Sequence, residues 1–518
     1  MSINSSSSLR SPPPSPTISY LTPRRALNDS FSIIEHELAS STQEILAECE
    51  RLRILLIGKS GAGKSSLINA TFKVDDAHVS HEQSGVSDIN QEIISKQNSR
   101  FVIHDSQGFA AGETQNFETV KKFIKDRAQR PELKDRLHAI WFCMEIPTEN
   151  GALFETADQS FFELDLENVP VIVVFTKYDL LISKLEMQAT DDVDDEEFKN
   201  FIRQKAENFF EETCVRPMRA ITSTCSYVKV SIKETDYYRN TLDNLVSETK
   251  NNLDEHMWIL WAIAQRASVE TKIDACIEVG RRKYWSGLVT GLHFPGKNLN
   301  QCLKIIHDDL IAVWNFNDPD ELLKSQGFKL SMTDMVNDLD MRESHHARET
   351  IATVSGMIGL ITAVIPGAVV IAVPAAAGVA IAQWLFFAYQ ETPAILQLMM
   401  GYIADLTTVL QCLFWMMRAN KEGSKVEQCH IDHAIDVHQK TGTQQVIHQK
   451  IRSFVSDSKT FKFGKKGRAL GELIKIIENV RFKPEEVGNG RPRALSRFTE
   501  SSFSTTLSTA GSTLGHKS

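Results

Sequence analysis

A glycine-rich loop between an apolar strand and a helix constrains this chain more than any other feature. Residues 53–57 read RILLI, and the overlapping run IGKSGAGKSS has the form G-x-x-x-x-G-K-S/T. In that context the pattern predicts a phosphate-binding loop, because backbone N–H groups and the amino end of the following helix point at one place. The predicted nucleotide contacts are Gly58, Lys59, Ser60, Gly61, Ala62, Gly63, Lys64, Ser65 and Ser66.

A second motif follows an apolar strand that we predict over residues 101–104. That strand runs into a D-x-x-G sequence from Asp105 to Gly108. Hydroxyl and carboxylate oxygens are ligands that Mg²⁺ prefers, so Ser65 and Asp105 are candidate metal ligands. We expect Lys64 to bridge the β- and γ-phosphates and the Gly108 amide to sense the γ-phosphate. The candidate catalytic residues are therefore Lys64, Ser65, Asp105 and Gly108.

A third motif indicates which base is bound. Residues 171–175 read VIVVF, and the next four residues, TKYD, match the pattern N/T-K-x-D. A carboxylate acceptor at Asp179 suits the ring N–H and amino group of guanine, and it would repel the acceptors of adenine. Thr176 completes the motif, and Lys177 would lie along the plane of the base. The three motifs in this order predict a site for a guanine nucleotide.

The three motifs resemble those of the translation-factor-related class of P-loop GTPases. Within that class they are most similar to Era, septin and immunity-associated GTPases and to uncharacterised G-domain proteins of fungi. The resemblance covers residues 51–251, and it implies a Rossmann-like G domain that binds GTP or GDP with Mg²⁺. It also implies slow hydrolysis of GTP that switches the conformation of the protein.

Several positions depart from the family pattern or match it weakly. The first switch of the family carries a threonine that completes the γ-phosphate and Mg²⁺ contacts, and Ser87 is the candidate here, unless it is an ordinary loop serine. The residue after D-x-x-G is Phe109, which cannot orient water, so we expect slow intrinsic hydrolysis. Ser223, in preference to Thr224, would offer a backbone N–H to the guanine carbonyl. We interpret His104 as a core residue rather than a base.

The alternation of apolar and amphipathic runs predicts the fold class. It is α/β, a P-loop G domain with a mostly parallel sheet, followed by an all-α C-terminal region that contains an apolar helical hairpin. The predicted strands are 53–57, 91–95, 101–104, 139–145, 171–175 and 219–222. The predicted helices are 64–72, 117–127, 196–212, 238–268, 298–314, 393–417, 425–439 and 444–455.

Composition divides the chain into four parts. Residues 1–50 form a predicted disordered, Ser/Pro-rich tail and its lead-in, and residues 51–251 form the G domain. Residues 252–487 form a helical domain, and residues 488–518 form a Ser/Thr-rich tail that we also expect to be disordered. Within the helical domain, residues 350–390 carry no charged side chain.

The apolar segment 350–390 has three open interpretations. Pro366 and Pro374 divide it into pieces shorter than the ~20 residues that a spanning helix needs. It is a membrane-inserted hairpin, a buried helical hairpin or an oligomer interface. The resemblance to immunity-related GTPases favours the membrane.

Charge and cysteine content narrow the partners and the compartment. The formal net charge of −9 and the lack of a long basic run make nucleic acid an unlikely partner. The 8 cysteines are scattered, and the N-terminus has no apolar signal-peptide core. We therefore expect a cytoplasmic protein, or one that is peripheral or integral on an intracellular membrane and faces the cytosol. We interpret Cys429, His430, His433 and His438 as a polar helix face, with no metal expected beyond Mg²⁺.

Two functions fit these features. The first is a slow, Mg²⁺-dependent GTPase whose G domain regulates a membrane-associating or oligomerising helical region. The sequence does not identify the water-orienting residue, which a second protomer, in a homo-oligomer through the G domain, or another partner would supply. The alternative is a non-hydrolysing, GTP-dependent switch or scaffold module.

Overall fold

The computed structural model describes the central part of the chain, with gaps. The described residues are 41–75, 88–107, 109, 114–147, 153–166, 168–189, 195–233, 235–254, 256–281, 299–337, 339, 393–421, 423–457 and 466–482. The apolar segment 350–390 and the tail 488–518 lie outside them, as do the first 40 residues.

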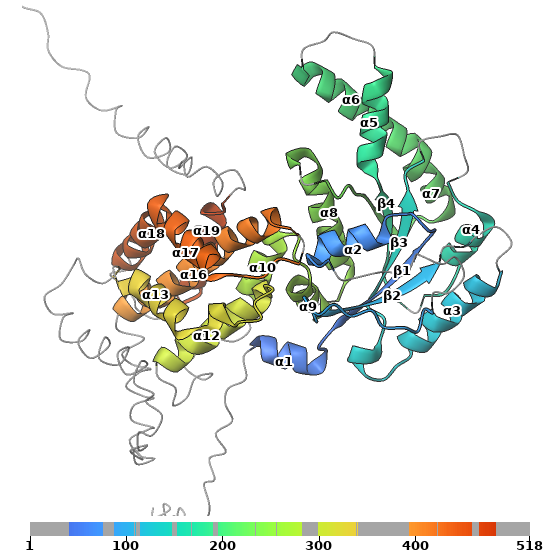
Figure 1. The fold of residues 1–518 in the computed structure, drawn as a ribbon. Helices are drawn as coiled ribbons and strands as arrows, with labels where there is room; N and C mark the ends of the chain where they lie inside the picture. Colours follow the sequence, from blue (N-terminus) through green and yellow to red (C-terminus); the bar gives the residue numbers. More distant parts are fainter. Residues whose placement is uncertain are drawn as a thin grey trace, which may run out of the picture. The chain divides into compact units, whose positions relative to one another are not determined.

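A parallel sheet organises the first half of the described chain (Figure 1). Its five strands lie in the order β2-β1-β3-β4-β5, and every neighbouring pair is parallel. This confirms the α/β class. The strands are β1 (Leu52–Gly58), β2 (Phe101–Gln107), β3 (Ala139–Glu145), β4 (Val171–Thr176) and β5 (Ser226–Lys229).

Helices cover both faces of this sheet because successive strand residues point to opposite sides. In β1, Ile54 and Leu56 pack with α2, α8 and α9, whereas Leu55 and Ile57 pack with α3 and α4. Helices α5, α6 and α7 cover the end of β4 through Phe175. The helices are α2 (Lys64–Phe72), α3 (Thr114–Ala128), α4 (Thr156–Phe162), α5 (Tyr178–Gln188), α6 (Asp195–Phe210), α7 (Arg216–Ile221), α8 (Asp236–Asn252) and α9 (Met257–Ala264).

Two predicted strands are wrong. Residues 91–95 form no strand, because only Ile93 bridges to β2, at Ile103. The predicted strand 219–222 instead lies at the end of α7, which begins with a proline in its first turn, a position that favours helix. The strand that pairs with β4 is the next segment, β5. Short apolar runs do not distinguish a strand from a helix by period alone.

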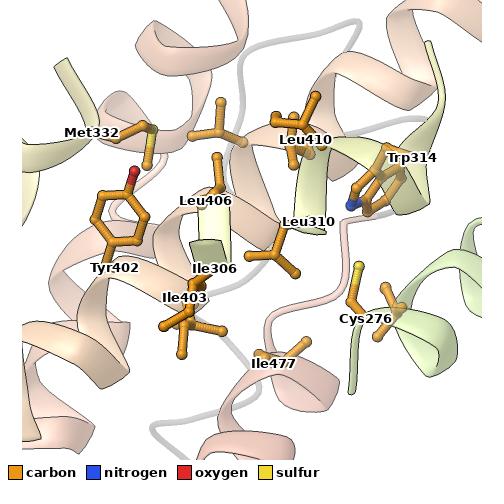
Figure 2. Packing of buried hydrophobic residues seen from close by; sticks show 14 of the residues in the cluster. Cys276, Ile306, Leu310, Trp314, Met332, Tyr402, Ile403, Leu406, Leu410 and Ile477 are labelled. Atoms are coloured by element: carbon orange, nitrogen blue, oxygen red, sulfur yellow. The ribbon is translucent and has the colours of Figure 1, made fainter. Parts of the chain in front are cut away.

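The second half is helical and encloses its own apolar core. Figure 2 shows side chains of this cluster from several helices, including Leu310, Leu406 and Ile477. The long helix α16 contacts α12, α13, α17, α18 and α19 and is the centre of this core. The helices are α10 (Val269–Gly280), α12 (Leu299–Trp314), α13 (Gln326–Asn337), α16 (Pro393–Ala419), α17 (Gln428–Lys440), α18 (Thr443–Asp457) and α19 (Lys466–Asn479).

One stretch of α16, Gln397–Ala419, is long and apolar enough to cross a membrane, and no other stretch among the described residues passes that test. The 18-residue window that passes the test is entirely buried inside the protein. A core helix of a soluble protein has the same length and composition, so this helix is weak evidence for a membrane.

Helix α9 belongs to both halves, although a single helix was predicted over 238–268. Helix α8 ends at Asn252. The next helix, α9, places Leu260 and Trp261 in the core beneath the sheet. Ile259 and Ile263, on its other side, pack in the core of the helical half. A helix that is apolar all round is one that is buried all round. The boundary predicted at 251/252 therefore falls just before a helix that both halves share.

The lead-in to the G domain, at the end of the segment 1–50, contains a helix. Ser41–Glu48 forms helix α1. Its first residues bond to a buried carboxylate of α12: the Thr42 N–H donates to Asp309 Oδ1 at 2.9 Å, and the Ser41 N–H donates to Asp309 Oδ2 at 3.2 Å. An acceptor at a helix amino end satisfies N–H groups that have no partner within the helix.

Candidate functional site

The three sequence motifs meet at one edge of the sheet. They begin at the carboxyl ends of β1, β2 and β4, and these strands are parallel, so the three ends lie together. In open parallel sheets this edge is where ligands bind.

The loop between β1 and α2 is shaped by glycine at both ends. A Cβ atom at Gly58 would clash with the carbonyl oxygen of Cys143 on β3, so only glycine fits there. Gly63 has a φ of 80° and precedes the first residue of α2. A left-handed residue at this point turns the chain sharply into the helix. Ser65 and Ser66 then lie in the first turn of α2, beside the loop.

Lys64 and Asp105 are buried against each other beneath this loop. Only 1% of Lys64 and 3% of Asp105 is exposed, and Lys64 Nζ lies 3.8 Å from Asp105 Oδ1. Lys64 Nζ also donates to the carbonyl oxygens of Gly58 and Lys59. The ammonium group is therefore held at the loop by backbone acceptors.

Burial dominates the electrostatics of this pair. It lowers the pKa of Lys64, and it raises the pKa of Asp105 to about 7 against the opposing charge of Lys64. Within the described residues, Asp105 Oδ1 accepts no hydrogen bond. A buried carboxylate oxygen without a donor suits a divalent cation, whose charge would stabilise the ionised form. The residues present therefore fit Mg²⁺.

The T-K-x-D motif is tied to the phosphate loop. The Thr176 hydroxyl donates to the carbonyl oxygen of Ala62 at 2.8 Å. Lys177 adopts a left-handed conformation, with a φ of 61°, and its Nζ lies 2.6 Å from Glu145 Oε2. Asp179 lies in the first turn of α5, 9% exposed, and its Oδ2 lies 3.3 Å from Lys233 Nζ. The Thr176 hydroxyl thus connects this motif directly to the phosphate loop.

Ser223 is not where the prediction requires it. It is exposed and precedes β5, at the amino end of that strand. Asp179 follows the carboxyl end of β4, and β4 and β5 are parallel. The residues that approach Asp179 are those after β5, since the Tyr178 N–H donates to Val230 O at 3.2 Å and Lys233 pairs with Asp179. Ser223 was misassigned because the last strand was predicted at 219–222, whereas β5 begins later, at Ser226.

The switch residues are only partly described. Ser87 and Gly108 lie outside the described residues. Phe109 is fully buried and packs against Phe117 and Phe161, with ring centroids 5.6 and 6.0 Å apart. Its side chain is part of the core under α3 and α4.

His104 is a core residue, as interpreted from the sequence. It is fully buried, its Nδ1 lies 2.9 Å from Ile89 O, and burial lowers its pKa to about 4. Three further partners escaped sequence reasoning: Glu145, Lys233 and Glu155, whose carboxylate pairs with the exposed Lys59 of the loop. No local sequence pattern marks these three residues, because the tertiary structure brings each of them to the site from a distant segment of the chain.

Two protein families match separate parts of the chain. Residues 53–177 match a family described as "50S ribosome-binding GTPase". Residues 53–177 belong to a P-loop GTPase domain. The structure around them is that of a G domain, and guanine-nucleotide binding is the property that this family supports for it. Residues 322–489, in the helical half, match a domain of unknown function (DUF8505).

Solved structures similar to the chain include several GTPases. A variant of Aquifex aeolicus Era bound to GDP and AlF4− is 17% identical, with a TM-score of 0.25, and the match covers 39% of this chain and 57% of the Era chain. A probable GTP-binding protein, EngB, is 17% identical with a TM-score of 0.23, covering 38% of this chain and 99% of EngB. A variant of S. thermophilus NFeoB bound to GDP and AlF4− is 14% identical with a TM-score of 0.21, covering 60% of this chain and 91% of the NFeoB chain. No curated protein is significantly similar to the chain.

Proposed function

We propose that this protein is a guanine-nucleotide switch whose G domain hydrolyses GTP slowly and controls its helical half. The observation that carries the proposal is the convergence of Lys64, Asp105 and Asp179 at the carboxyl edge of one parallel sheet. A phosphate-binding cation, a metal-binding carboxylate and a base-reading carboxylate are the three groups that a guanine-nucleotide site needs.

The phosphate loop would bind the nucleotide through its backbone. Residues 58–66 present N–H groups at the amino end of α2, where phosphate is favoured. Lys64 would exchange its present backbone acceptors for the β- and γ-phosphates, and Ser66 would reach the α-phosphate. Lys64 would then stabilise negative charge that develops on the bridging oxygen and the γ-phosphate.

Ser65, Asp105 and Ser87 are the residues that we assign to Mg²⁺, with the Gly108 amide on the γ-phosphate. When bound, Mg²⁺ would neutralise charge on the phosphate oxygens. Asp105 would bind in its ionised form, although burial now raises its pKa to about 7.

Thr176, Lys177 and Asp179 are assigned to the base. The Thr176 hydroxyl holds the loop against β4, Lys177 lies along the ring and Asp179 accepts from guanine. Lys233 pairs with Asp179 Oδ2, and this ion pair would orient the carboxylate. We assign the third base-contacting segment to residues 231–233 in place of Ser223.

Asp179→Asn is expected to exchange guanine for xanthine specificity. An asparagine amide donates where the carboxylate accepted, so it repels the N–H of guanine and suits the additional carbonyl of xanthine. Calorimetry should show GDP affinity reduced by at least about 100-fold and XDP affinity increased, since a site built to hydrogen-bond one group strongly rejects its analogue. Glu163→Gln, a carboxylate-to-amide change at the C-terminal end of α4, is the control. Unchanged preference for GDP over XDP in a folded Asp179→Asn variant would refute the base assignment.

A non-hydrolysing switch is the second candidate, and Phe109 favours it. The side chain at the position of the water-orienting residue is fully buried in the core, so it cannot reach a water molecule at the γ-phosphate. Single-turnover hydrolysis at rising protein concentration separates the candidates. We expect a rate that is slow and rises with concentration, because a second protomer would complete the site. A flat rate near zero would favour a binding module.

We also propose that residues 350–390 associate with an intracellular membrane on its cytosolic side. The support is their composition, which lacks charged side chains. A variant that lacks this segment should move from the membrane fraction to the soluble fraction. Equal recovery of both proteins in the soluble fraction would contradict this.

A further inference from the structure

The carboxyl end of the P-loop helix α2 is bonded to residues outside the helix. Carbonyl oxygens in the last turn of a helix have no partner within it. In α2, the Thr71 oxygen accepts from the backbone N–H of Arg266 at 2.8 Å, and the Phe72 oxygen accepts from Asn98 Nδ2 at 3.4 Å. The helix that begins at Lys64, in the phosphate loop, therefore ends on two residues that are distant from it in sequence.

Asn98 uses the whole of its side-chain amide. It lies in the loop before β2 and is 2% exposed. Its Nδ2 also donates to Ala264 O at 2.8 Å, at the end of α9. Its Oδ1 accepts from Asn315 Nδ2 at 3.0 Å and from the Arg100 N–H at 3.2 Å. A side-chain amide has two N–H donors and an oxygen with two lone pairs, so all four positions are occupied.

Asn315 extends these bonds into the helical half. It directly follows α12, and its Nδ2 also donates to Ile263 O at 3.0 Å. Its carbonyl oxygen accepts from Arg266 Nε at 2.6 Å. Figure 2 shows Leu310 and Trp314 of α12 in the core of the helical half. We call Asn98, Arg266 and Asn315, with the carbonyl groups that they bond, the Asn98 network. It joins the P-loop helix to α12.

Helix α12 is also bonded to the chain ahead of the phosphate loop. Its buried Asp309 accepts from the N–H groups of Ser41 and Thr42 at the start of α1. Only residues 49–51 separate α1 from β1, and β1 runs into the phosphate loop. One helix of the helical half therefore holds the nucleotide-binding segment on both sides of the loop, through Asp309 before it and Asn315 after it.

We propose that nucleotide bound at the phosphate loop stabilises α12 through the Asn98 network. The inference rests on the proposed function and names the route by which the G domain would act on the helical half. Opening of α12 would leave buried groups of the network unpaired, which is costly, and would free the carboxyl end of α2. The phosphate loop lies at the other end of α2. A ligand that binds only the folded site opposes every opening that disrupts that site.

Hydrogen exchange of the full-length protein tests this proposal. Exchange is followed by mass spectrometry with and without GDP and Mg²⁺, and calorimetry on the same preparations measures GDP binding. At a GDP concentration about 100 times the dissociation constant, an element that opens only together with the site is protected about 100-fold. In the wild type we expect GDP to slow exchange in α12 by at least about 10-fold.

Asn315→Gly is the deciding variant. The φ of Asn315 is 48°, so glycine keeps the left-handed backbone and removes only the amide. GDP should still bind and slow exchange in α2, whereas its slowing of exchange in α12 should fall below about 2-fold. Asn98→Ala cuts the network from the side of the G domain and should give the same result. Asn315→Gly decides alone if Asn98→Ala does not fold.

Asn252→Ala is the matched control. Asn252 is half-buried, as Asn315 is, and its amide bonds to Ser226 and Glu248 within the G domain. This substitution removes an amide of similar burial and leaves the Asn98 network intact. GDP should therefore still slow exchange in α12 by at least about 10-fold.

Two results would overturn this proposal alone. One is GDP binding to the wild type that leaves exchange in α12 unchanged. The other is equal slowing of exchange in α12 in the wild type and in folded Asn315→Gly, which would mean that the shared helix α9 joins the two halves without the network. A wild-type protein that binds no GDP in calorimetry would overturn the proposed function, and this inference with it.

Discussion

Lys64→Ala is expected to lower the affinity for GDP and GTP by about 30- to 3,000-fold. Lys64 is buried at the phosphate loop, where two backbone carbonyl oxygens hold its ammonium group. Removing one partner of a buried, hydrogen-bonded charge pair costs about 2–5 kcal/mol. Each 1.4 kcal/mol corresponds to about a tenfold change in affinity. Calorimetric titration of both nucleotides in the presence of Mg²⁺ measures the loss.

The same substitution should barely reduce stability without nucleotide. It removes a desolvated ammonium group, and it leaves Asp105, whose pKa burial already raises to about 7, free to protonate. Lys121→Ala, on the exposed face of α3, is the matched control and should leave nucleotide affinity unchanged. A folded Lys64→Ala protein that binds GDP within about threefold of the wild type would refute the site.

Asp405→Ala is expected to destabilise the helical half by about 3–5 kcal/mol, the usual cost of removing one partner from a buried pair. Asp405 is fully buried in the middle of α16. It accepts from His438 Nε2 of α17 at 3.0 Å and from His448 Nε2 of α18 at 2.8 Å. Alanine would leave two buried imidazoles without their acceptor and three helices without their polar connection. Urea unfolding of the full chain, followed by circular dichroism, measures the change.

This network also makes stability depend on pH. Burial alone would raise the pKa of Asp405, but the hydrogen bonds from His438 and His448 outweigh it and hold the pKa below its ordinary 3.8. A carboxyl whose folded pKa is depressed stabilises the fold above its unfolded pKa, and this contribution disappears as the pH falls through the folded value. The difference in unfolding free energy between the wild type and Asp405→Asn should therefore be smaller at about pH 3 than at about pH 5.

Asp436→Ala is the matched control for Asp405. Asp436 lies on the exposed side of α17 and pairs with Lys440 one turn later. Exposed pairs of this kind contribute about 0.3–0.5 kcal/mol, so the control should stay near the wild type. A loss below about 1 kcal/mol in Asp405→Ala would show that the network is not a main support of the helical half.

The role of His438 could not be predicted from the sequence. The spacing of three histidines, His430, His433 and His438, suits a polar helix face. That interpretation is wrong for His438, because its side chain is buried. In the structure, His438 faces inward to Asp405, which is distant in sequence. Helical spacing defines which residues share a face, but the neighbouring helices decide which face is buried.

Asp179 and its neighbours show the same limit within the G domain. The strand before the T-K-x-D motif is a strong apolar run, and its position was predicted to within one residue. The strand β5 beside it reads SYVK, which is too short and too polar to be recognised alone. It is a strand because β4 offers it a parallel partner. Because this strand was predicted too early, Ser223 was assigned to the loop after it. In the structure Ser223 precedes β5, and only the loop after the carboxyl end of β5 reaches the site.

The sequence by itself determined the G domain and the side chains at the carboxyl edge of its sheet. A strand, a glycine-rich turn and a helix are local features. Lys64, Asp105 and Asp179 each lie at or shortly after the end of an apolar run that is visible in the chain. The tertiary structure alone decided which loop approaches Asp179, that Phe109 is buried in the core, and that α9 packs in two cores. All of these features depend on contacts between segments that are far apart in sequence. Such contacts leave no periodic or local pattern, because they are determined by which surfaces are buried together and not by residue spacing.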